Sequence, residues 1–189
     1  MDDPDLASAK AELREELLAG RRARTESELA AARAAIRGRV LEVVDVACVA
    51  AYVPLRTEPG SVELLASLVA RGVRVLVPHT LPDRDLDWTQ WSAGGPGPLL
   101  GPDAVATAGL VLVPALAVAL DGTRLGRGGG SYDRALRRVP PGTPTAALVF
   151  ADEVLPEVPR DEWDVPVAAA VTPDGWLALG GNADFPPQR

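Results

Sequence analysis

Apolar residues recur at helical spacing in the first seventy residues of the chain. Near the start, the apolar positions are Leu6, Ala9, Leu13 and Leu17. Because residues three and four apart share one face of a helix, this spacing predicts an amphipathic N-terminal helix. A second helix is predicted through residues 28–40, with Ser27 as its N-cap and Gly38 near its end, and a third between Ser61 and Gly72.

The rest of the chain is dominated by short continuous apolar segments of strand length. They cover residues 43–53, 73–78, 109–114, 145–150 and 165–172. Continuous apolar strands separated by helices are typical of a mainly parallel sheet covered on both faces. We therefore predict one α/β domain over residues 1–180, a three-layer α/β/α fold, followed by a loose tail at 181–189. The segment 92–103 is rich in Gly and Pro and is predicted to be a surface excursion or a lid.

Composition narrows the class of protein. Of the 189 residues, 47% are hydrophobic and only 4% aromatic, so the core must be built mainly from Ala, Val and Leu. Cys48 is the single cysteine and His79 the single histidine, which excludes a disulfide and a multi-histidine metal site within one chain. The acidic first twenty residues do not resemble a secretion signal, and no apolar run is long enough to span a membrane. We expect a cytoplasmic protein, most simply a monomer.

Charge narrows the class of partner. The formal net charge is −7 and the pI is near 4.8, which argues against a general nucleic-acid or membrane surface. Any polyanion should be small and held in a local basic pocket. Of the 19 basic residues only Lys10 is a lysine, four positions before Arg14 on the predicted first helix. Lys10 is either a flexible ligand for phosphate or a lysine without a specific role on a solvated helix face.

The segment RLGRGGGSYDRAL, residues 124–136, gives the clearest indication of a ligand-binding site. It follows an apolar strand and precedes a helical pattern, so its glycines are expected at a helix N-terminus. Glycine lets backbone amides approach a ligand closely, and the helix end adds unpaired N–H donors, a combination that binds anions. Ser131 is a suitable residue for the helix cap.

The residues around the glycines suggest a polyphosphate. Arg124, Arg127 and Arg134 flank the loop and could clamp phosphate oxygens, and Asp133 could serve Mg²⁺ or could simply favour the first turn of the helix. The loop lacks the Gly-Lys-Ser/Thr of a P-loop, and Ser131 stands where a dinucleotide fingerprint needs glycine. The alternative to a phosphate site is a tight turn whose arginines lie in water.

At these residues the chain resembles a known family. RLGRGGGSYDRAL is similar to the Arg-Leu-Gly-x-Gly-x-Gly-Tyr-Tyr-Asp signature of 5-formyltetrahydrofolate cyclo-ligases, also called methenyltetrahydrofolate synthetases. KAELR (residues 10–14) and YVPLRTEPGSVELL (52–65) resemble two further family segments. LVLVPALAV, VLPEVPRDEWD and AAAVTPDG extend the resemblance in the same order, over most of residues 10–175.

The resemblance implies an enzyme that uses ATP and Mg²⁺ to close 5-formyltetrahydrofolate to 5,10-methenyltetrahydrofolate. It implies nucleotide contacts from Lys10, Ala11, Glu12, Leu13, Arg14, Leu125, Gly126, Arg127, Gly128, Gly129, Gly130, Ser131, Tyr132 and Asp133. The implied catalytic residues are Lys10, Arg127 and Tyr132. The implied folate contacts are Val53, Glu58 and Tyr132, and the implied metal ligands are Asp133 and Asp164.

Several implied roles have structural alternatives. Glu58 could be a solvated loop carboxylate, since Pro59 and Gly60 make this region a turn, and Val53 could belong to a strand core. Trp88 and Trp91 could form an aromatic wall for a pterin, although core or interface packing is the simpler expectation.

The chain also departs from the family pattern. Ser131 replaces the first tyrosine of the signature, and Val118-Ala119 stands where Phe-Asp is frequent. Trp163 replaces a frequent histidine before Asp164, and Ala168 replaces a frequent acidic residue. These departures affect the metal site most. The main hypothesis is an ATP-dependent cyclo-ligase; the alternatives are a non-catalytic nucleotide- or folate-binding relative and, by fold analogy alone, a sugar-phosphate or coenzyme A enzyme.

Overall fold

The computed structural model describes residues 4–181, so most of the predicted tail lies outside the described residues. The helices are α1 (Pro4–Ala23), α2 (Glu26–Val43), α3 (Val62–Ala70) and α4 (Ser131–Leu136), with 3₁₀ turns at Pro102–Thr107 and Ala151–Glu153. The strands are β1 (Cys48–Ala50), β2 (Arg74–Thr80), β3 (Leu86–Gln90), β4 (Leu110–Pro114), β5 (Ala117–Ala119), β6 (Arg124–Leu125), β7 (Thr145–Leu148), β8 (Val154–Leu155), β9 (Ala169–Thr172) and β10 (Gly175–Ala178).

A seven-stranded, mainly parallel sheet forms the centre of the molecule. Its strand order is β10-β9-β7-β4-β1-β2-β3. The inner pairs β9/β7, β7/β4, β4/β1 and β1/β2 are parallel, whereas β3 and β10 pair with their neighbours in antiparallel fashion. The antiparallel edges arise because β2 and β9 each connect to the next strand by a short turn, whereas a parallel connection needs a crossover.

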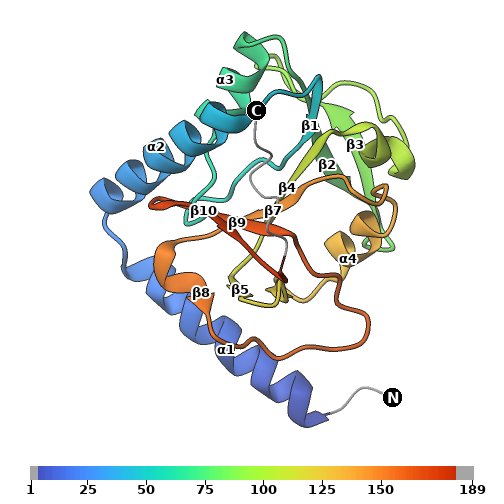
Figure 1. The fold of residues 1–189 in the computed structure, drawn as a ribbon. Helices are drawn as coiled ribbons and strands as arrows, with labels where there is room; N and C mark the ends of the chain where they lie inside the picture. The colour runs from blue at the N-terminus through green and yellow to red at the C-terminus, as the bar shows by residue number, and fades with distance from the viewer. Residues whose placement is uncertain (1–3, 182–189) are drawn as a thin grey trace.

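Helices cover both faces of this sheet, as Figure 1 shows. On one face, Ile36 and Val40 of α2 and three leucines of α3 pack on the inner strands. On the other face, Ala135 and Leu136 of α4 pack with the 3₁₀ turn and Trp88. The prediction of a three-layer α/β/α fold with a mainly parallel sheet is thus confirmed.

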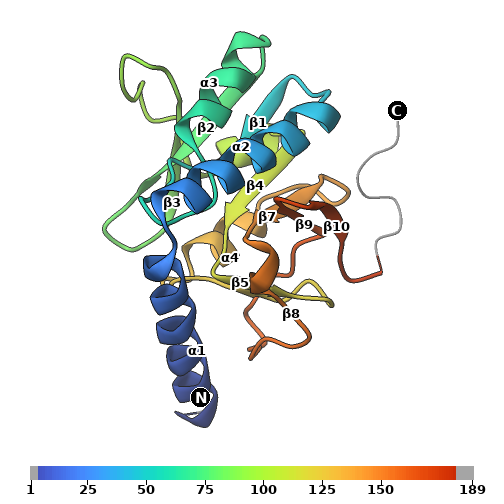
Figure 2. The same cartoon turned by 90° about the vertical axis from the view of Figure 1, so that its left-hand side faces the viewer.

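Helix α1 lies outside these layers, beside a second, three-stranded sheet of order β6-β5-β8 (Figures 1 and 2). Leu13, Leu17 and Leu18 of α1 pack against the apolar cluster that contains Leu116 and Leu125. The N-terminal helix therefore buries its leucine face against this small sheet, which the sequence did not predict.

The structure corrects two local predictions. The N-cap of α2 is Thr25, not Ser27, because Thr25 and Glu28 form a reciprocal capping box. The predicted strand at 43–53 is formed only over Cys48–Ala50, since α2 continues to Val43 and buries Val40 against the sheet. Packing of this helical face outweighs the strand preference of the β-branched residues.

Three further features bear on the predictions. Within residues 4–181, none of the helices combines the length and apolar character that crossing a bilayer requires. The segment 92–103 forms an exposed excursion, attached through a bridge between Thr89 and Leu99. Trp88 is fully buried in β3, so it is a core residue and not part of an aromatic wall for a pterin.

Candidate active site

A cavity of about 910 Å³ opens at the carboxyl ends of β1, β2 and β4. This edge is where open α/β sheets bind ligands, because the loops that leave parallel strands gather there. Its wall includes Val53 after β1, Thr80 at the end of β2 and Ala115 after β4, together with one face of α1 and residues 124–134. Of the described residues, those of segment 92–103 take no part in lining it.

Helix α1 contributes its two predicted cations to this cavity. Lys10 Nζ lies 2.5 Å from Asp164 Oδ2, and Arg14 Nε donates to the carbonyl of Gly126 at 2.9 Å. The intervening residues of the KAELR segment point elsewhere: Ala11 and Glu12 are exposed, and Leu13 packs on the small sheet. Lys10 and Arg14 are four positions apart and share one helix face, so the structure brings both to the cavity, but not the three residues between them.

The predicted glycine loop lines the cavity as one continuous segment, residues 124–134. Gly128 and Gly130 have positive φ angles of +94° and +65°, which side-chain-bearing residues rarely adopt. A Cβ at Gly128 would also lie 3.5 Å from Arg14 Cζ. Gly130 is the N-cap of α4 and Ser131 its first residue, so the prediction that Ser131 caps the helix is wrong.

The three arginines of the loop have different environments. Arg124 is buried and pairs with Asp133 at 2.8 Å, while Arg134 donates to the carbonyls of Arg84 and Gly129. Arg127 is 45% exposed, and its Nε lies 3.3 Å from Glu58 Oε1. Arg127 is therefore the loop arginine that is most accessible to a ligand.

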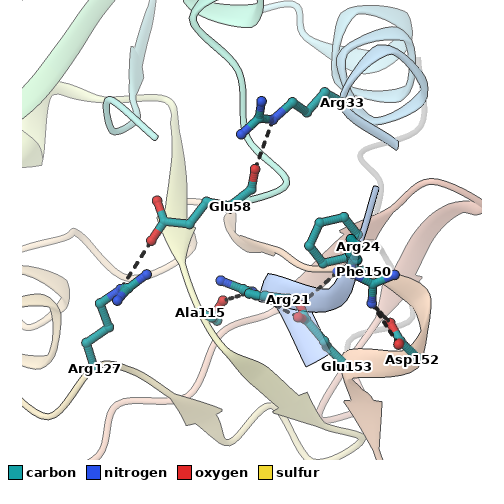
Figure 3. Close-up of polar contacts among 9 residues, drawn as sticks. All are labelled: Arg21, Arg24, Arg33, Glu58, Ala115, Arg127, Phe150, Asp152 and Glu153. Atoms are coloured by element: carbon teal, nitrogen blue, oxygen red, sulfur yellow. Dashed lines mark hydrogen bonds and ion pairs between the residues drawn. The ribbon is translucent and has the colours of Figure 1, made fainter. Parts of the chain in front are cut away.

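Glu58 is a buried carboxylate in the cavity wall, with only 4% of its surface exposed. Its Oε2 accepts from the Leu55 amide at 2.8 Å, and its Oε1 faces Arg127 (Figure 3). It is therefore not the solvated loop carboxylate that the sequence left open. Val53, by contrast, is 53% exposed although it follows a buried strand, because it faces the open cavity.

Two tyrosines line the cavity with buried hydroxyl groups, Tyr52 and Tyr132. Neither hydroxyl has a hydrogen-bond partner among the described residues. Burial raises the pKa of Tyr132. The pKa of Tyr52 is raised well above its ordinary value, mainly by burial and to a smaller extent by the negative charge of Glu58. Both phenols stay protonated at neutral pH and are hydrogen-bond donors rather than bases.

Asp133 and Asp164, the two expected metal ligands, lie on adjacent parts of the cavity wall. Asp133 Oδ1 accepts from Arg124 and from the Val165 amide, and Asp164 Oδ2 accepts from Lys10 and the Asp161 amide. Within residues 4–181, no cluster of three or more His, Cys, Asp or Glu side chains could hold a metal by itself.

Comparison with known proteins identifies the family to which the chain belongs. The family model described as the 5-formyltetrahydrofolate cyclo-ligase family matches residues 6–173. The chain belongs to the 5-formyltetrahydrofolate cyclo-ligase family. It is 36% identical over 189 residues to a 5-formyltetrahydrofolate cyclo-ligase of Mycolicibacterium smegmatis, covering 90% of this chain and 97% of that protein. The cyclo-ligase family predicted from the motif, and with it a ligase, is confirmed.

Solved structures support the same fold. A 5,10-methenyltetrahydrofolate synthetase of Mycoplasma pneumoniae superposes with a TM-score of 0.76 at 21% identity, covering 87% of this chain and 98% of that one. The corresponding synthetase of Aquifex aeolicus gives a TM-score of 0.70 at 24% identity, covering 95% and 96%. These similarities show that the cyclo-ligase chain has the synthetase fold.

Sequence reasoning missed part of the cavity wall. The missed residues include Leu6 and Ala7 on α1, Pro78 and Thr80 on β2, Leu86 on β3, and Arg137 and Trp163 at the rim. For Leu6 and Ala7 a signal existed, because they lie one turn before Lys10 on the same helix face. For β2 and β3 only the strand order, which is a tertiary property, brings the residues to the site.

Proposed function

We propose that the protein catalyses the ATP-dependent closure of 5-formyltetrahydrofolate to 5,10-methenyltetrahydrofolate, with release of ADP and phosphate. The observation that carries the proposal is that one cavity is lined both by the cationic glycine loop and by the wall around Glu58. At about 910 Å³ it has the size of a cavity for small organic ligands. A site that only bound phosphate would have no use for the buried Glu58 carboxylate.

The chemistry requires two substrates side by side. The formamide carbonyl is a poor electrophile, and its oxygen leaves badly as hydroxide. Transfer of the γ-phosphoryl group to that oxygen forms a new P–O bond and breaks the bond to ADP. N10 of the folate then attacks the formyl carbon and loses its proton, and the C–O bond breaks with phosphate as the leaving group. Such transfer needs positioning and neutralisation of charge more than covalent participation by the protein.

The residues of the cavity suit these tasks. We assign the triphosphate to Lys10, Arg14, Arg127 and the amides of residues 126–130, because cations and accessible N–H groups stabilise phosphate charge. Lys10 and Arg127 would neutralise charge on the transferring phosphoryl group, for which Arg127 has to leave Glu58. The protonated Tyr132 would donate a hydrogen bond to bound substrate.

We assign the folate to the side of the cavity that contains Val53 and Glu58. Glu58 is acceptor-only when ionised, which suits the N–H groups of a pterin ring. The exposed apolar surface of Val53 gives the ring a face to pack on.

The residues present also fit Mg²⁺. This ion typically takes one or two carboxylates and completes its shell with substrate phosphates and water. Among the described residues, no hydrogen bond reaches Oδ2 of Asp133 or Oδ1 of Asp164, so each carboxylate keeps an oxygen for a metal. Bound there, Mg²⁺ would neutralise charge on the phosphates. Asp133 and Asp164 would orient it, and their pairing with Arg124 and Lys10 would fix the position of the carboxylates.

Purified protein mixed with 5-formyltetrahydrofolate, ATP and Mg²⁺ should generate the near-ultraviolet absorbance of the methenyl product. Omission of ATP or of Mg²⁺ should each abolish the signal, because phosphorylation of the formyl oxygen precedes closure. If the complete mixture gives no signal above a protein-free control, yet calorimetry detects binding of ATP or folate, the protein is a non-catalytic binding relative instead.

From composition and charge we also propose a cytoplasmic monomer that binds neither nucleic acid nor membranes. A net charge of −7 disfavours such polyanionic surfaces. Light scattering of the purified protein tests whether it is a monomer. A measured mass of twice 19.7 kDa would contradict this proposal.

A further inference from the structure

The loop after β1 that carries Glu58 is held in a turn by two hydrogen bonds of its own. The Glu58 amide donates to the Leu55 carbonyl at 3.0 Å, and the Leu55 amide donates to Glu58 Oε2 at 2.8 Å. These two bonds make a tight turn and direct the Glu58 side chain into the cavity wall. None of the backbone amides within the turn donates a hydrogen bond to the carbonyl of Arg56 or of Glu58.

Those carbonyls are bound by an arginine that is not part of the cavity wall. Arg33 of α2 donates from Nε to the Glu58 carbonyl at 3.0 Å, and from Nη2 to the carbonyls of Arg56 at 2.7 Å and Leu55 at 3.3 Å. In Figure 3, Arg33 and Arg127 approach Glu58 from opposite ends, one at its backbone and one at its carboxylate. One planar guanidinium thus holds three acceptors of a single turn.

The helix that carries Arg33 is a rigid support. Ile36 and Val40, one and two turns further along α2, are fully buried against the central sheet. The loop's ion pair to α2, between Arg56 and Glu26, is long at 3.4 Å and highly exposed at both ends, so it contributes little. Arg33 is therefore the main link between the turn and this helix.

We propose that Arg33 is a positioning residue for the folate side of the cavity. It fixes the turn at residues 55–58, and so the place of the Glu58 carboxylate, without touching substrate itself. The inference rests on the proposed function, because it assigns Glu58 to folate. Without Arg33 the turn would sample more conformations, and binding of the folate would have to order it.

Arg33→Met tests this role, since methionine keeps an apolar stem and removes all the donors. We expect the Kd and KM for 5-formyltetrahydrofolate to rise on the order of 10-fold, while the KM for ATP changes by less than about 2-fold. Hydrogen exchange at the Leu55 and Glu58 amides should become faster. Arg33→Lys should be intermediate, because lysine keeps the charge but not the planar fork.

Arg37→Met is the matched control. Arg37 lies one turn further along the same helix and makes none of the hydrogen bonds or ion pairs described for the loop. It should leave folate binding and exchange at the loop amides at wild-type values.

Three outcomes would overturn the proposal: unchanged amide exchange in Arg33→Met, faster exchange with unchanged folate affinity, or an equal rise in the KM values for folate and ATP. Failure of the wild-type protein to bind folate would instead overturn the proposed function. The two failures are therefore distinguishable.

Discussion

At the scale of single residues, the most deeply buried charge is that of Arg21 near the end of α1. Its Nε and Nη2 lie 2.6 and 2.7 Å from the two oxygens of Glu153, and Nη2 also donates to the Ala115 carbonyl at 2.6 Å. Both partners are almost fully buried, at 1% and 2% exposure. Figure 3 shows this pair beside Phe150. Because Ala115 lines the cavity, Arg21 ties the helix that carries Lys10 to the cavity wall.

Arg21→Met should lower the free energy of unfolding by about 3–5 kcal/mol, because it leaves Glu153 buried without its cation. Burial raises the pKa of Glu153, and Arg21 opposes that rise, so the variant raises this pKa further. A carboxyl whose pKa is raised in the folded state takes up a proton there before the unfolded chain does. The stability deficit of Arg21→Met should therefore shrink as the pH falls from 8 towards the unfolded pKa of Glu153.

Thermal unfolding of wild type and variant at pH 8 and pH 5.5 measures this difference, and other titrating groups cancel between the two proteins. The double variant Arg21→Met, Glu153→Gln should recover part of the lost stability at pH 8, since it removes the unpaired charge. A deficit that is the same at both pH values would contradict an ionised Glu153 as its cause.

At the scale of elements, the start of α2 illustrates how local chemistry sets a boundary. Thr25 Oγ1 accepts from the Glu28 amide at 3.2 Å, and the Thr25 amide donates to Glu28 Oε2 at 2.7 Å. The bonds that Glu28 Oε2 accepts from the Thr25 amide and hydroxyl lower the pKa of Glu28. Their contribution to stability is present above the unfolded pKa and is lost as the pH falls through the lower folded pKa. Ser27 also resembles a cap by residue type, but it lies inside the first turn.

Thr25→Ala should therefore destabilise the protein by about 1 kcal/mol, the usual cost of losing an N-cap. Ser27→Ala is the matched control and should change stability by less than about 0.5 kcal/mol, because it removes no cap. Chemical denaturation of the two variants gives the comparison. A larger loss in Ser27→Ala than in Thr25→Ala would mean that the helix begins two residues later.

At the scale of the whole molecule, the cavity depends on where α1 lies relative to the rest of the fold. The helix packs on the small sheet through its leucines, while Lys10 and Arg14 line the same cavity as the glycine loop. A nucleotide bound between them would contact both α1 and the loop, and would therefore stabilise the folded state as a whole.

ATP with Mg²⁺ at about 100 times its Kd should raise the free energy of unfolding by about 2.7 kcal/mol, or the Tm by roughly 5–10 °C. Lys10→Met should show a smaller shift at the same ATP concentration, because it removes the cation that we propose as a phosphate ligand. Arg22→Met, on the exposed side of the same helix, is the control and should shift like wild type. Equal shifts in all three proteins would remove Lys10 from the nucleotide site.

Much of the site was visible in the sequence because its parts are contiguous. The glycine loop, its arginines and Asp133 occupy eleven positions in a row, and Lys10 and Arg14 are related by helical spacing. Of residues 10–14, only Lys10 and Arg14 line the cavity, whereas Leu13 packs on the small sheet. Arg21 and Arg33 carried no such signal, since an arginine on a helix is normally solvated.

The sequence by itself determined the class of fold, the run of parallel strands, the glycine loop and the family, because each depends on local spacing or on a contiguous motif. Only the tertiary structure decided the antiparallel edges, the small sheet beneath α1, the inward turn of Arg124, and the roles of Arg21 and Arg33. The contacts made by these three arginines join residues from 9 to 132 positions apart. Side chains at such separations meet only when the strand order and helix packing have been fixed, and no local pattern specifies that.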